Sequence, residues 1–561
     1  METTHDAARV KFLQKERGER GMVGKFLLRL TSRERYLAGI SCILFVACVA
    51  FILVAFTRDS QSQSYCLSAT CVSTAAQLLA AMDVTADPCE DFFEYACGQW
   101  NKRNVIPDDE HSFNTFEKLH DELQIILRQL LEEKESLKDS NATTKAKVFY
   151  KSCMNITQIN NERDAPLHDV TEDLGGWPII KDNWDSDSFV LETVLAEIRR
   201  GYNAPILIGC WVEADDKNSS RYIIQLDQPV LGMPDREYYL KGKSESEFVQ
   251  AYLSFMRGVV HLMGSPGDDV EDQLMDLLEF ETELANVTRP RAERHDTGAL
   301  YNKMTITKLQ LLVPQIDWLL FLRHAVNPSL TADEEVLVFA VDYLYDMMNI
   351  VQQKDKRTVA NYLIWRVVMM LAPELSEDYQ EVHNKYKMVL HGVKRGKIRW
   401  KKCVEDINKH MGLAVGAMFV RENFKPESKE TALEMIRDIR NAFNELLDEN
   451  EWMDEETKAV AKQKANAMDA RIGYPDFITD PQKLDAKYAG LDLEEDHYFN
   501  NILAIKRFDA DTKMSRLRDT VLKDVWEQPP AEINAFYNPN ANDIVFPAAI
   551  LQPLFYSAKF P

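Results

Sequence analysis

Histidines and cysteines are the residues of this chain whose chemistry depends most on spacing. A zinc hydrolase that binds its metal on a helix needs two histidines at i and i+4, so that both imidazoles face one ion. The sequence contains 11 histidines, and the closest pair, His383 and His391, is eight residues apart. It contains no H-E-x-x-H, no G-x-S-x-G and no G-x-x-x-x-G-K-[ST]. The spacing therefore predicts none of these catalytic sites within the 561 residues.

The cysteines favour an oxidising compartment. Cys42 and Cys48 lie in a long apolar segment, and seven others follow it: Cys66, Cys71, Cys89, Cys97, Cys153, Cys210 and Cys403. Four of the seven crowd one stretch, which is typical of disulfides in a secreted region, with a zinc site as the alternative. None of the spacings in that stretch is C-x-x-C, which weakens the zinc alternative. Because seven is odd, at least one of these thiols has no partner within the chain.

Four N-x-[ST] sequons agree with an extracellular location. They begin at Asn141, Asn155, Asn218 and Asn286. Each is weak evidence alone because the pattern is short, but together they predict a glycosylated exterior region.

The apolar segment Tyr36–Phe56 carries no charged residue and is long enough to cross a bilayer as a helix. The 35 residues before it hold nine Lys/Arg against five Asp/Glu, and the chain after it turns acidic. This asymmetry predicts an N-terminus in the cytosol. A cleaved signal peptide is disfavoured because the stretch is long, starts late and lacks a small-x-small cleavage site. A buried core helix would rarely be free of charge for so long.

The net charge of −23 argues against a nucleic-acid partner. One basic run, Lys394–Lys402, stands out against this background. A solvated face is the first interpretation of such a run, and a patch for a glycan or an acidic partner is the second.

Helical periodicity dominates the roughly 500 residues beyond the apolar segment. Leu119, Leu123, Ile126 and Leu130 form one apolar stripe. A second helix is expected from an N-cap at Asp454 to a stop near Gly473 and Pro475. Strand-like segments are few: 204–209 and 222–226 are expected to pair, and 533–537 with 543–546 predict a hairpin.

Several segments together carry a family resemblance. They are Asp87–Pro107 (DPCEDFFEYACGQWNKRNVIP), Leu231–Leu240 (LGMPDREYYL), Asn361–Val368 (NYLIWRVV), Gly412–Phe424 (GLAVGAMFVRENF), Trp452–Lys458 (WMDEETK), Arg471–Ile478 (RIGYPDFI), Asn534–Tyr537 (NAFY) and Ile544–Phe555 (IVFPAAILQPLF). In this order, from Cys66 onward, they resemble the neprilysin and endothelin-converting-enzyme family of membrane zinc metalloendopeptidases.

The resemblance implies a mainly α fold: a two-lobed helical ectodomain of neprilysin type with a thermolysin-like catalytic lobe, behind one transmembrane helix. It divides the chain into a cytosolic tail (1–35), a signal anchor (36–57), a stalk (58–65), a helical peptidase-family region (66–475) and the start of the catalytic lobe (476–561). The implied place is the plasma membrane, with the ectodomain outside the cell and short extracellular peptides as substrates. A homodimer is possible within the family.

The resemblance also assigns roles to residues. In the family, an edge strand bearing Asn-Ala-x-Tyr lies beside the substrate, here Asn534, Ala535 and Tyr537, and pairs with its backbone by β-addition. An arginine that holds the substrate carboxylate matches Arg103, whose planar guanidinium suits a carboxylate. The second arginine of the family corresponds to Ser112, which puts removal of C-terminal dipeptides in doubt.

The metal site of the family would lie beyond Pro561. The resemblance implies one zinc ion for each full-length chain, and none is expected to bind these 561 residues, which are therefore predicted to be inactive. It pairs Cys66 with Cys71 and Cys153 with Cys403, and it leaves Cys89, Cys97 and Cys210 unpaired here. Either the sequence is a fragment of an enzyme, or it is a truncated, non-catalytic isoform that binds peptides or partners.

Overall fold

A computed structural model describes residues 31–59, 66–181, 183–240, 246–264, 267, 269–523, 525–553 and 555–557. Most of the predicted cytosolic tail and stalk, and the residues after 557, lie outside this description. The chain divides into two compact units, Met1–Ala80 and Ala81–Phe560.

The first unit contains helix α2 (Ser32–Asp59) and most of α3 (Ala69–Ala81). A disulfide joins Cys66 to Cys71 at the start of α3. Helix α2 includes the segment for which the sequence predicts an anchor. Among the described residues, no helix meets the length and apolarity needed to cross a membrane.

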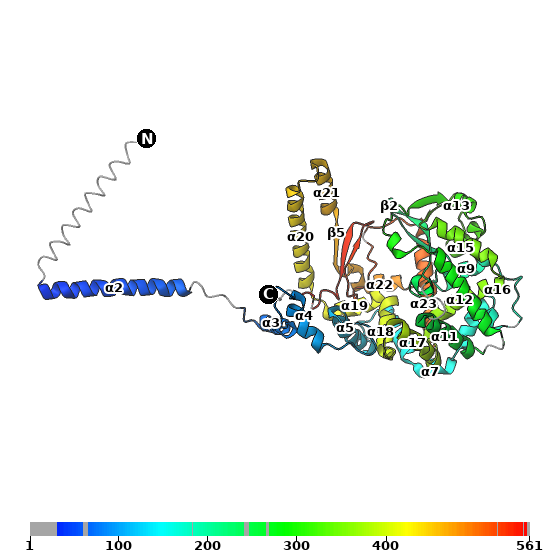
Figure 1. Cartoon of the computed structure of the whole chain (residues 1–561), viewed down its shortest axis with the longest axis horizontal. Coiled ribbons are helices and arrows are strands. Elements are labelled where there is room, and N and C mark those ends of the chain that lie inside the picture. Colours follow the sequence, from blue (N-terminus) through cyan, green and yellow to red (C-terminus); the bar gives the residue numbers. More distant parts are fainter. Residues whose placement is uncertain are drawn as a thin grey trace. The chain divides into compact units, whose positions relative to one another are not determined.

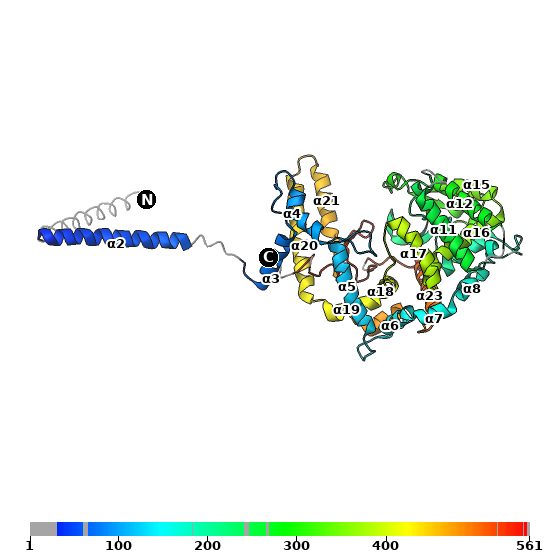
Figure 2. The same ribbon diagram turned by 60° about the horizontal axis from the view of Figure 1, so that its bottom comes forward.

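The second unit is mainly helical (Figures 1 and 2). Its α-helices are α4 (Phe92–Arg103), α5 (Thr115–Glu132), α6 (Asn141–Met154), α7 (Ile156–Glu162), α8 (Ala165–Asp173), α9 (Leu191–Gly201), α10 (Glu237–Leu240), α11 (Glu247–Leu262), α12 (Val270–Val287), α13 (Ile306–Leu312), α14 (Trp318–Ala325), α15 (Val341–Gln353), α16 (Lys356–Leu371), α17 (Glu377–His391), α18 (Arg399–His410), α19 (Gly412–Asn423), α20 (Pro426–Glu449), α21 (Glu455–Ala467), α22 (Pro481–Lys487) and α23 (Tyr498–Met514). Short 3-10 helices lie at Pro178–Ile180, Arg291–Glu293, Ala372–Glu374, Asp476–Thr479 and Ser515–Arg518. Figure 2 shows α20 and α21 on one side of this unit and α11, α12, α15 and α16 on the other.

Two small sheets interrupt the helices. The first has the order β1 (Gly209–Asp215), β2 (Asn218–Asp227), β4 (Glu335–Val338), β3 (Asn302–Thr305), and only β2 and β4 run parallel. The second has the order β5 (Asp469–Gly473), β7 (Asp543–Pro547), β6 (Phe536–Asn538). In it β5 is parallel to β7, and β6 is antiparallel to β7. The strand β6 is therefore an edge of its sheet.

The predicted apolar stripe lies on α5 as expected. The helix begins after Asn114, whose side chain accepts a hydrogen bond from the backbone N–H of Glu117 at 3.1 Å. Leu119, Leu123 and Leu130 are all buried; Leu123 and Leu130 belong to the main core, and Ile126 is packed against it. The 3.6-residue period of these side chains therefore predicted the buried face correctly.

The expected strand at 204–209 is wrong. The segment Gly209–Asp215 pairs with β2 instead, and only Gly209 belongs to both ranges. Asn203 and Leu207 have positive φ values of 53° and 57°, which break an extended chain. The partner segment 222–226 does lie within β2.

The helix expected from Asp454 to Gly473 begins as predicted but ends early. The Asp454 side chain accepts a hydrogen bond from the N–H of Thr457 at 2.7 Å. The helix stops at Ala467, and the next residues form β5, which pairs with β7. A long-range strand partner thus overrides the local helical signal.

A buried polar cluster joins two of the segments that carry the family resemblance. Glu281 on α12 accepts hydrogen bonds from the N–H of Gly232 at 2.7 Å and from the Tyr252 hydroxyl at 2.9 Å. The hydroxyl of Tyr252 in turn accepts from Trp365 Nε1 at 2.8 Å, and Arg366 pairs with Glu281 at 3.2 Å. Because a buried carboxylate is costly unless it is paired, this cluster explains why the LGMPD and NYLIWR segments must meet.

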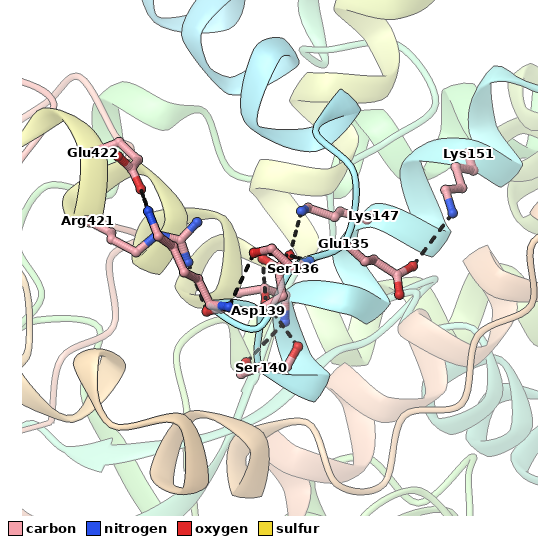
Figure 3. Close-up of polar contacts among 10 residues, drawn as sticks. Glu135, Ser136, Asp139, Ser140, Lys147, Lys151, Arg421 and Glu422 are labelled. Atoms are coloured by element: carbon pink, nitrogen blue, oxygen red, sulfur yellow. Dashed lines mark hydrogen bonds and ion pairs between the residues drawn. The ribbon is translucent and has the colours of Figure 1, made fainter.

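The connection between α5 and α6 is held by a second buried ion pair (Figure 3). Lys147 on α6 lies 2.9 Å from Asp139, and only 2% of each side chain is exposed. Asp139 also accepts from the backbone N–H of Ser136 at 2.9 Å. Arg421 on α19 donates to the Lys138 carbonyl at 3.0 Å, so the same loop is tied to α19. A disulfide between Cys153 and Cys403 joins α6 to α18.

Candidate functional site

The candidate site is the edge strand β6 and the hollows beside it. Residues Phe536, Tyr537 and Asn538 of β6 pair with β7, and the other side of β6 faces no described strand. The predicted hairpin is present, but its first strand begins at Phe536, later than the expected Ile533. Asn534 and Ala535 therefore precede the strand and do not belong to it. Both are exposed, as is Tyr537.

Asn534 is held by a local contact. Its side-chain oxygen accepts a hydrogen bond from the N–H of Ala535 at 2.9 Å. No hydrogen bond from its side-chain nitrogen is found among the described residues. This donor is therefore available to a ligand that lies along the edge.

The two faces of the β5–β7–β6 sheet have different environments. Ile472 and Phe546 pack in one apolar cluster with Ala432 and Ile436 of α20. Helix α20 lies beside β5 (Figure 1). The opposite face carries the row Arg471, Val545 and Phe536, which are register partners across the three strands. This second face lines a cavity of about 310 Å³.

The cavity lies between two hairpins. Its far wall includes Glu213 and Tyr222 from β1 and β2. Asn540, in the turn before β7, donates to Asp216 in the turn between β1 and β2 at 2.8 Å. We call this space the hairpin pocket.

Burial and the nearby Glu527 carboxylate raise the pKa of Glu213, which lines the hairpin pocket.

Arg471, on β5, stabilises the side of the hairpin pocket that the β5–β7–β6 sheet forms. Its guanidinium lies 2.8 Å from the Asp543 carboxylate, which is almost fully buried. It also donates to the carbonyl oxygens of Val525 and Lys523. Because one planar group bonds both a strand and the neighbouring loop, the sheet and the loop are held in one arrangement.

A second cavity, of about 520 Å³, lies beside the residues that precede β6. Ile533 and Glu532 line it together with Phe116 and His120 on α5 and Glu405 on α18. We call it the α5 pocket. Burial raises the pKa of Glu532, although the neighbouring His120 opposes this shift. The hairpin pocket, which β6 lines, and the α5 pocket, which the residues before β6 line, thus both contain a carboxyl group with a raised pKa.

The remaining predicted site residues lie elsewhere. Arg103 is exposed at the last residue of α4, and no hydrogen bond or ion pair in the described part of the chain joins it to 534–537. The sequons at Asn141, Asn218 and Asn286 are exposed, whereas Asn155 is half-buried. Among the cysteines outside the two disulfides, Cys89 is exposed, Cys97 is half-buried and Cys210 is buried.

The described residues offer no metal centre. No cluster of three or more His, Cys, Asp or Glu side chains in this part of the chain is arranged to hold an ion. The residues present do not fit a zinc site, and we derive no chemical step through zinc.

The basic run Lys394–Lys402 forms a solvated face, its first interpretation, only in part, because Lys394 and Arg395 are exposed whereas its last two lysines are mostly covered. Only 14% of Lys401 and 24% of Lys402 are exposed, and they pair with Asp121 and Glu374. Lys397 lies 2.7 Å from Glu405, which lines the α5 pocket. Charge counting alone could not find Asp121, because it lies 280 residues from Lys401 in the sequence.

A strand with an unpaired edge can accept an extended peptide as a further strand, and pockets nearby can take its side chains. Residues 88–475 match the model of peptidase family M13. The chain is 40% identical over 512 residues to membrane metallo-endopeptidase-like 1 of Homo sapiens, which covers 88% of this chain and 66% of that protein. It is 38% identical over 519 residues to endothelin-converting enzyme 1 of Bos taurus, covering 92% of this chain and 68% of that protein.

A solved structure of a peptidase has a similar fold. The fold matches a zinc metalloprotease of Mycobacterium tuberculosis, solved in complex with an inhibitor, with a TM-score of 0.74 and 25% identity over 86% of this chain and 70% of that one. The protein belongs to peptidase family M13. The chain spans about two thirds of the length of the curated relatives that it matches.

Proposed function

We propose that the protein is a cell-surface member of the M13 zinc metalloendopeptidases, held by an N-terminal anchor at 36–57, and that its β6 edge binds short extracellular peptides. The observation that carries this proposal is the unpaired edge of β6, which lines the hairpin pocket and follows the exposed Asn534, while the α5 pocket lies beside the preceding Ile533. An extended peptide gains affinity by pairing its backbone with such an edge, and the flanking pockets take its side chains. The names of the relatives, metallo-endopeptidase and endothelin-converting enzyme, support a peptide as the ligand.

For the 561 residues themselves we propose binding without hydrolysis, because the sequence contains no H-E-x-x-H. In the whole enzyme, zinc would polarise the scissile carbonyl and lower the pKa of a bound water. The second candidate is a non-catalytic isoform that uses the same edge to bind peptides or partners. The two candidates differ only in whether a longer polypeptide exists, which transcript sequencing beyond the codon for Pro561 decides.

Peptide binding tests the proposal. We expect the full chain, purified in detergent, to bind a dye-labelled peptide of about eight residues, measured by fluorescence anisotropy. Asn534→Ala should weaken binding about tenfold, the value of one or two lost hydrogen bonds. The matched control is Asn302→Ala, at an exposed asparagine on β3 in the other sheet. Equal effects of the two substitutions, or no binding by the unmodified chain, would contradict the proposal.

A second measurement tests the absence of hydrolysis. We expect no chelator-sensitive cleavage of a fluorogenic peptide by the full chain with added zinc. Cleavage that a chelator abolishes would show that a metal site exists among these residues.

A further inference from the structure

The α5 pocket contains hydrogen-bond acceptors for which the described residues supply no donor. Its volume of about 520 Å³ lies within the range of roughly 300–1,000 Å³ that is usual for ligand pockets. Its apolar lining includes Leu123, Leu127 and Val404. A side chain with a long apolar stem and a polar end therefore suits the composition of this pocket.

Gln124, on α5, holds its side-chain oxygen without a donor. Only 4% of this residue is exposed, and its Nε2 group donates to Glu405 at 2.7 Å and lies 2.9 Å from Nε2 of His120. The reverse orientation would set the amide oxygen against the Glu405 carboxylate. An amide nitrogen only donates, so His120 accepts through Nε2 and adds no positive charge in this arrangement. The buried Oε1 atom of Gln124 has no partner among the described residues.

Asn408, on α18, repeats this arrangement in the same pocket. Its Nδ2 group donates to the carbonyl oxygen of Ala531 at 2.8 Å, which fixes the orientation of the amide. Its Oδ1 atom is buried, and no donor in the described part of the chain reaches it. Because a buried acceptor without a donor is costly, two of them in one pocket point to a ligand that brings donors.

The carboxyl groups of the α5 pocket outnumber its cations. The lining includes Glu117, Glu405 and Glu532, and Lys409 is the one lysine or arginine among its described residues. Glu405 is already paired with Lys397, whose ammonium lies 2.7 Å away. No ion pair of Glu117 or Glu532 is found within the described part of the chain. The pocket therefore keeps a negative charge even when Lys409 is counted against one of these two.

Glu532 also lies close to the proposed peptide-binding edge. It stands two residues before the exposed Asn534, and Ile533 between them lines the same pocket. Two residues of extended chain span at most about 7 Å, a distance that a lysine or arginine side chain can bridge. Burial raises the pKa of Glu532, and a cation beside the carboxylate would stabilise its ionised form.

We propose that the α5 pocket binds a cationic group of the peptide, with Glu532 as its counter-charge and the amide oxygens of Gln124 and Asn408 as further acceptors. The group is a lysine or arginine side chain or the N-terminal ammonium. A guanidinium, with five N–H donors, offers enough donors for these three residues. The inference rests on the proposed function, because it assigns the pocket to a peptide that contacts Asn534. It makes Glu532 a residue that determines specificity for basic peptides.

Peptides that differ only in charge test this inference with the full chain in detergent. In a series of N-acetylated peptides of about eight residues, one arginine occupies each position in turn, and a matched series carries the neutral isostere citrulline there. The parent peptide without arginine is measured with a free and with an acetylated N-terminus. We expect one arginine position, or the free amine, to bind about tenfold more tightly than its neutral counterpart. Whichever does so identifies the source of the cation.

Substitutions of two glutamates connect this preference to the pocket. In Glu532→Gln the charged and neutral peptides should bind within about twofold of each other, and Glu532→Asp should keep part of the preference. The neutral peptides should bind Glu532→Gln as tightly as the unmodified chain, which shows that the variant is folded. The matched control is Glu122→Gln, at an exposed glutamate on α5, which should keep the whole preference.

Three results would overturn the inference and leave the proposed function intact. They are equal binding of charged and neutral peptides by the unmodified chain, a preference that survives in Glu532→Gln, and the same loss in Glu122→Gln as in Glu532→Gln. In each of them the peptides still bind, and Asn534→Ala still weakens that binding. Failure of every peptide to bind the unmodified chain would overturn both proposals.

Discussion

The ammonium group of Lys147 lies 2.9 Å from the carboxylate of Asp139, and both side chains are almost completely buried. Burial alone would raise the pKa of Asp139, but the hydrogen bonds from Lys147 and from the Ser136 amide hold this pKa below its usual value. The pair therefore remains charged, and it fixes the loop between α5 and α6 (Figure 3).

Breaking this pair should be strongly destabilising. We expect Lys147→Met to lower the free energy of unfolding by about 3–5 kcal/mol, because the Asp139 carboxylate is left buried without its partner. The double variant Lys147→Met/Asp139→Leu should recover much of that loss. Urea denaturation of the three proteins measures the effect, and Lys134→Met serves as a control on the surface. Equal losses in the single and the double variant would contradict this explanation.

The disulfide between Cys153 and Cys403 closes a loop of 250 residues and is buried between α6 and α18. Replacing both cysteines with alanine should lower the free energy of unfolding by about 3–5 kcal/mol, because long loops lose the most entropy on closure. Guanidinium denaturation checks this. The control is the double replacement of Cys66 and Cys71, which are five residues apart and lie in the first unit. A larger effect in that control would count against the argument.

The sequence predicted local features that depend on neighbouring residues. The stripe of Leu119, Leu123 and Leu130 follows one helix face, and Asp454 caps a helix through the N–H of Thr457 three residues later. The hairpin near the C-terminus was predicted because its turn residues lie between two short apolar segments. Each of these signals lies within a few residues of the structure that it specifies.

Features that depend on distant partners could not be predicted from local pattern. The strand β5 follows an alanine-rich helix and exists because β7, about 70 residues later, pairs with it. Likewise, the whole basic run was interpreted first as a solvated face, but Lys401 pairs with Asp121 and is mostly covered. A substrate contact at Asn534 was predicted only from the family resemblance, which places this residue on the edge strand, whereas it precedes β6.

Acid should destabilise the protein through His383. This side chain packs against Phe255, with ring centres 5.4 Å apart, and burial, assisted by the charge of Lys387, lowers its pKa to about 4. In the unfolded chain the pKa is about 6.5, so the unfolded state binds more protons between these values and stability falls as the pH drops from about 6.5 toward 4. The loss attributable to His383 at pH 5 is about 2 kcal/mol.

The variant His383→Gln should therefore lose about 2 kcal/mol less stability than the unmodified chain between pH 7 and pH 5. Urea denaturation at several pH values measures this difference. His261→Gln, at an exposed histidine on α11, should leave the pH dependence unchanged. The same slope in His383→Gln and the unmodified chain would show that other groups cause the acid sensitivity.

Glycan occupancy should differ among the four sequons. Asn141, Asn218 and Asn286 are exposed, and we expect glycans on all three when the chain is secreted by a eukaryotic cell. Asn155 is half-buried between α6 and α7; its side chain accepts from the N–H of Gln158 at 3.2 Å and donates to Asp496 at 3.4 Å. A bulky glycan there would displace these contacts, so Asn155 should be unoccupied. Mass spectrometry after enzymatic deglycosylation in heavy-oxygen water tests this, and full occupancy at Asn155 would contradict it.

Cys210 should react with a thiol reagent much more slowly than Cys89 and Cys97. Cys210 is buried, and burial raises its pKa to about 11, although Arg199 opposes the shift. Because the thiolate is the reactive form, ionisation alone should slow its modification near neutral pH about 300-fold relative to an ordinary thiol. In the folded protein a maleimide should modify Cys89 first and Cys97 more slowly, whereas Cys210 should react only after unfolding. Peptide mass spectrometry over time follows each site. Cys210→Ala should leave the labelling of the other two unchanged, and reaction of Cys210 at the rate of Cys89 would show that its surroundings open readily.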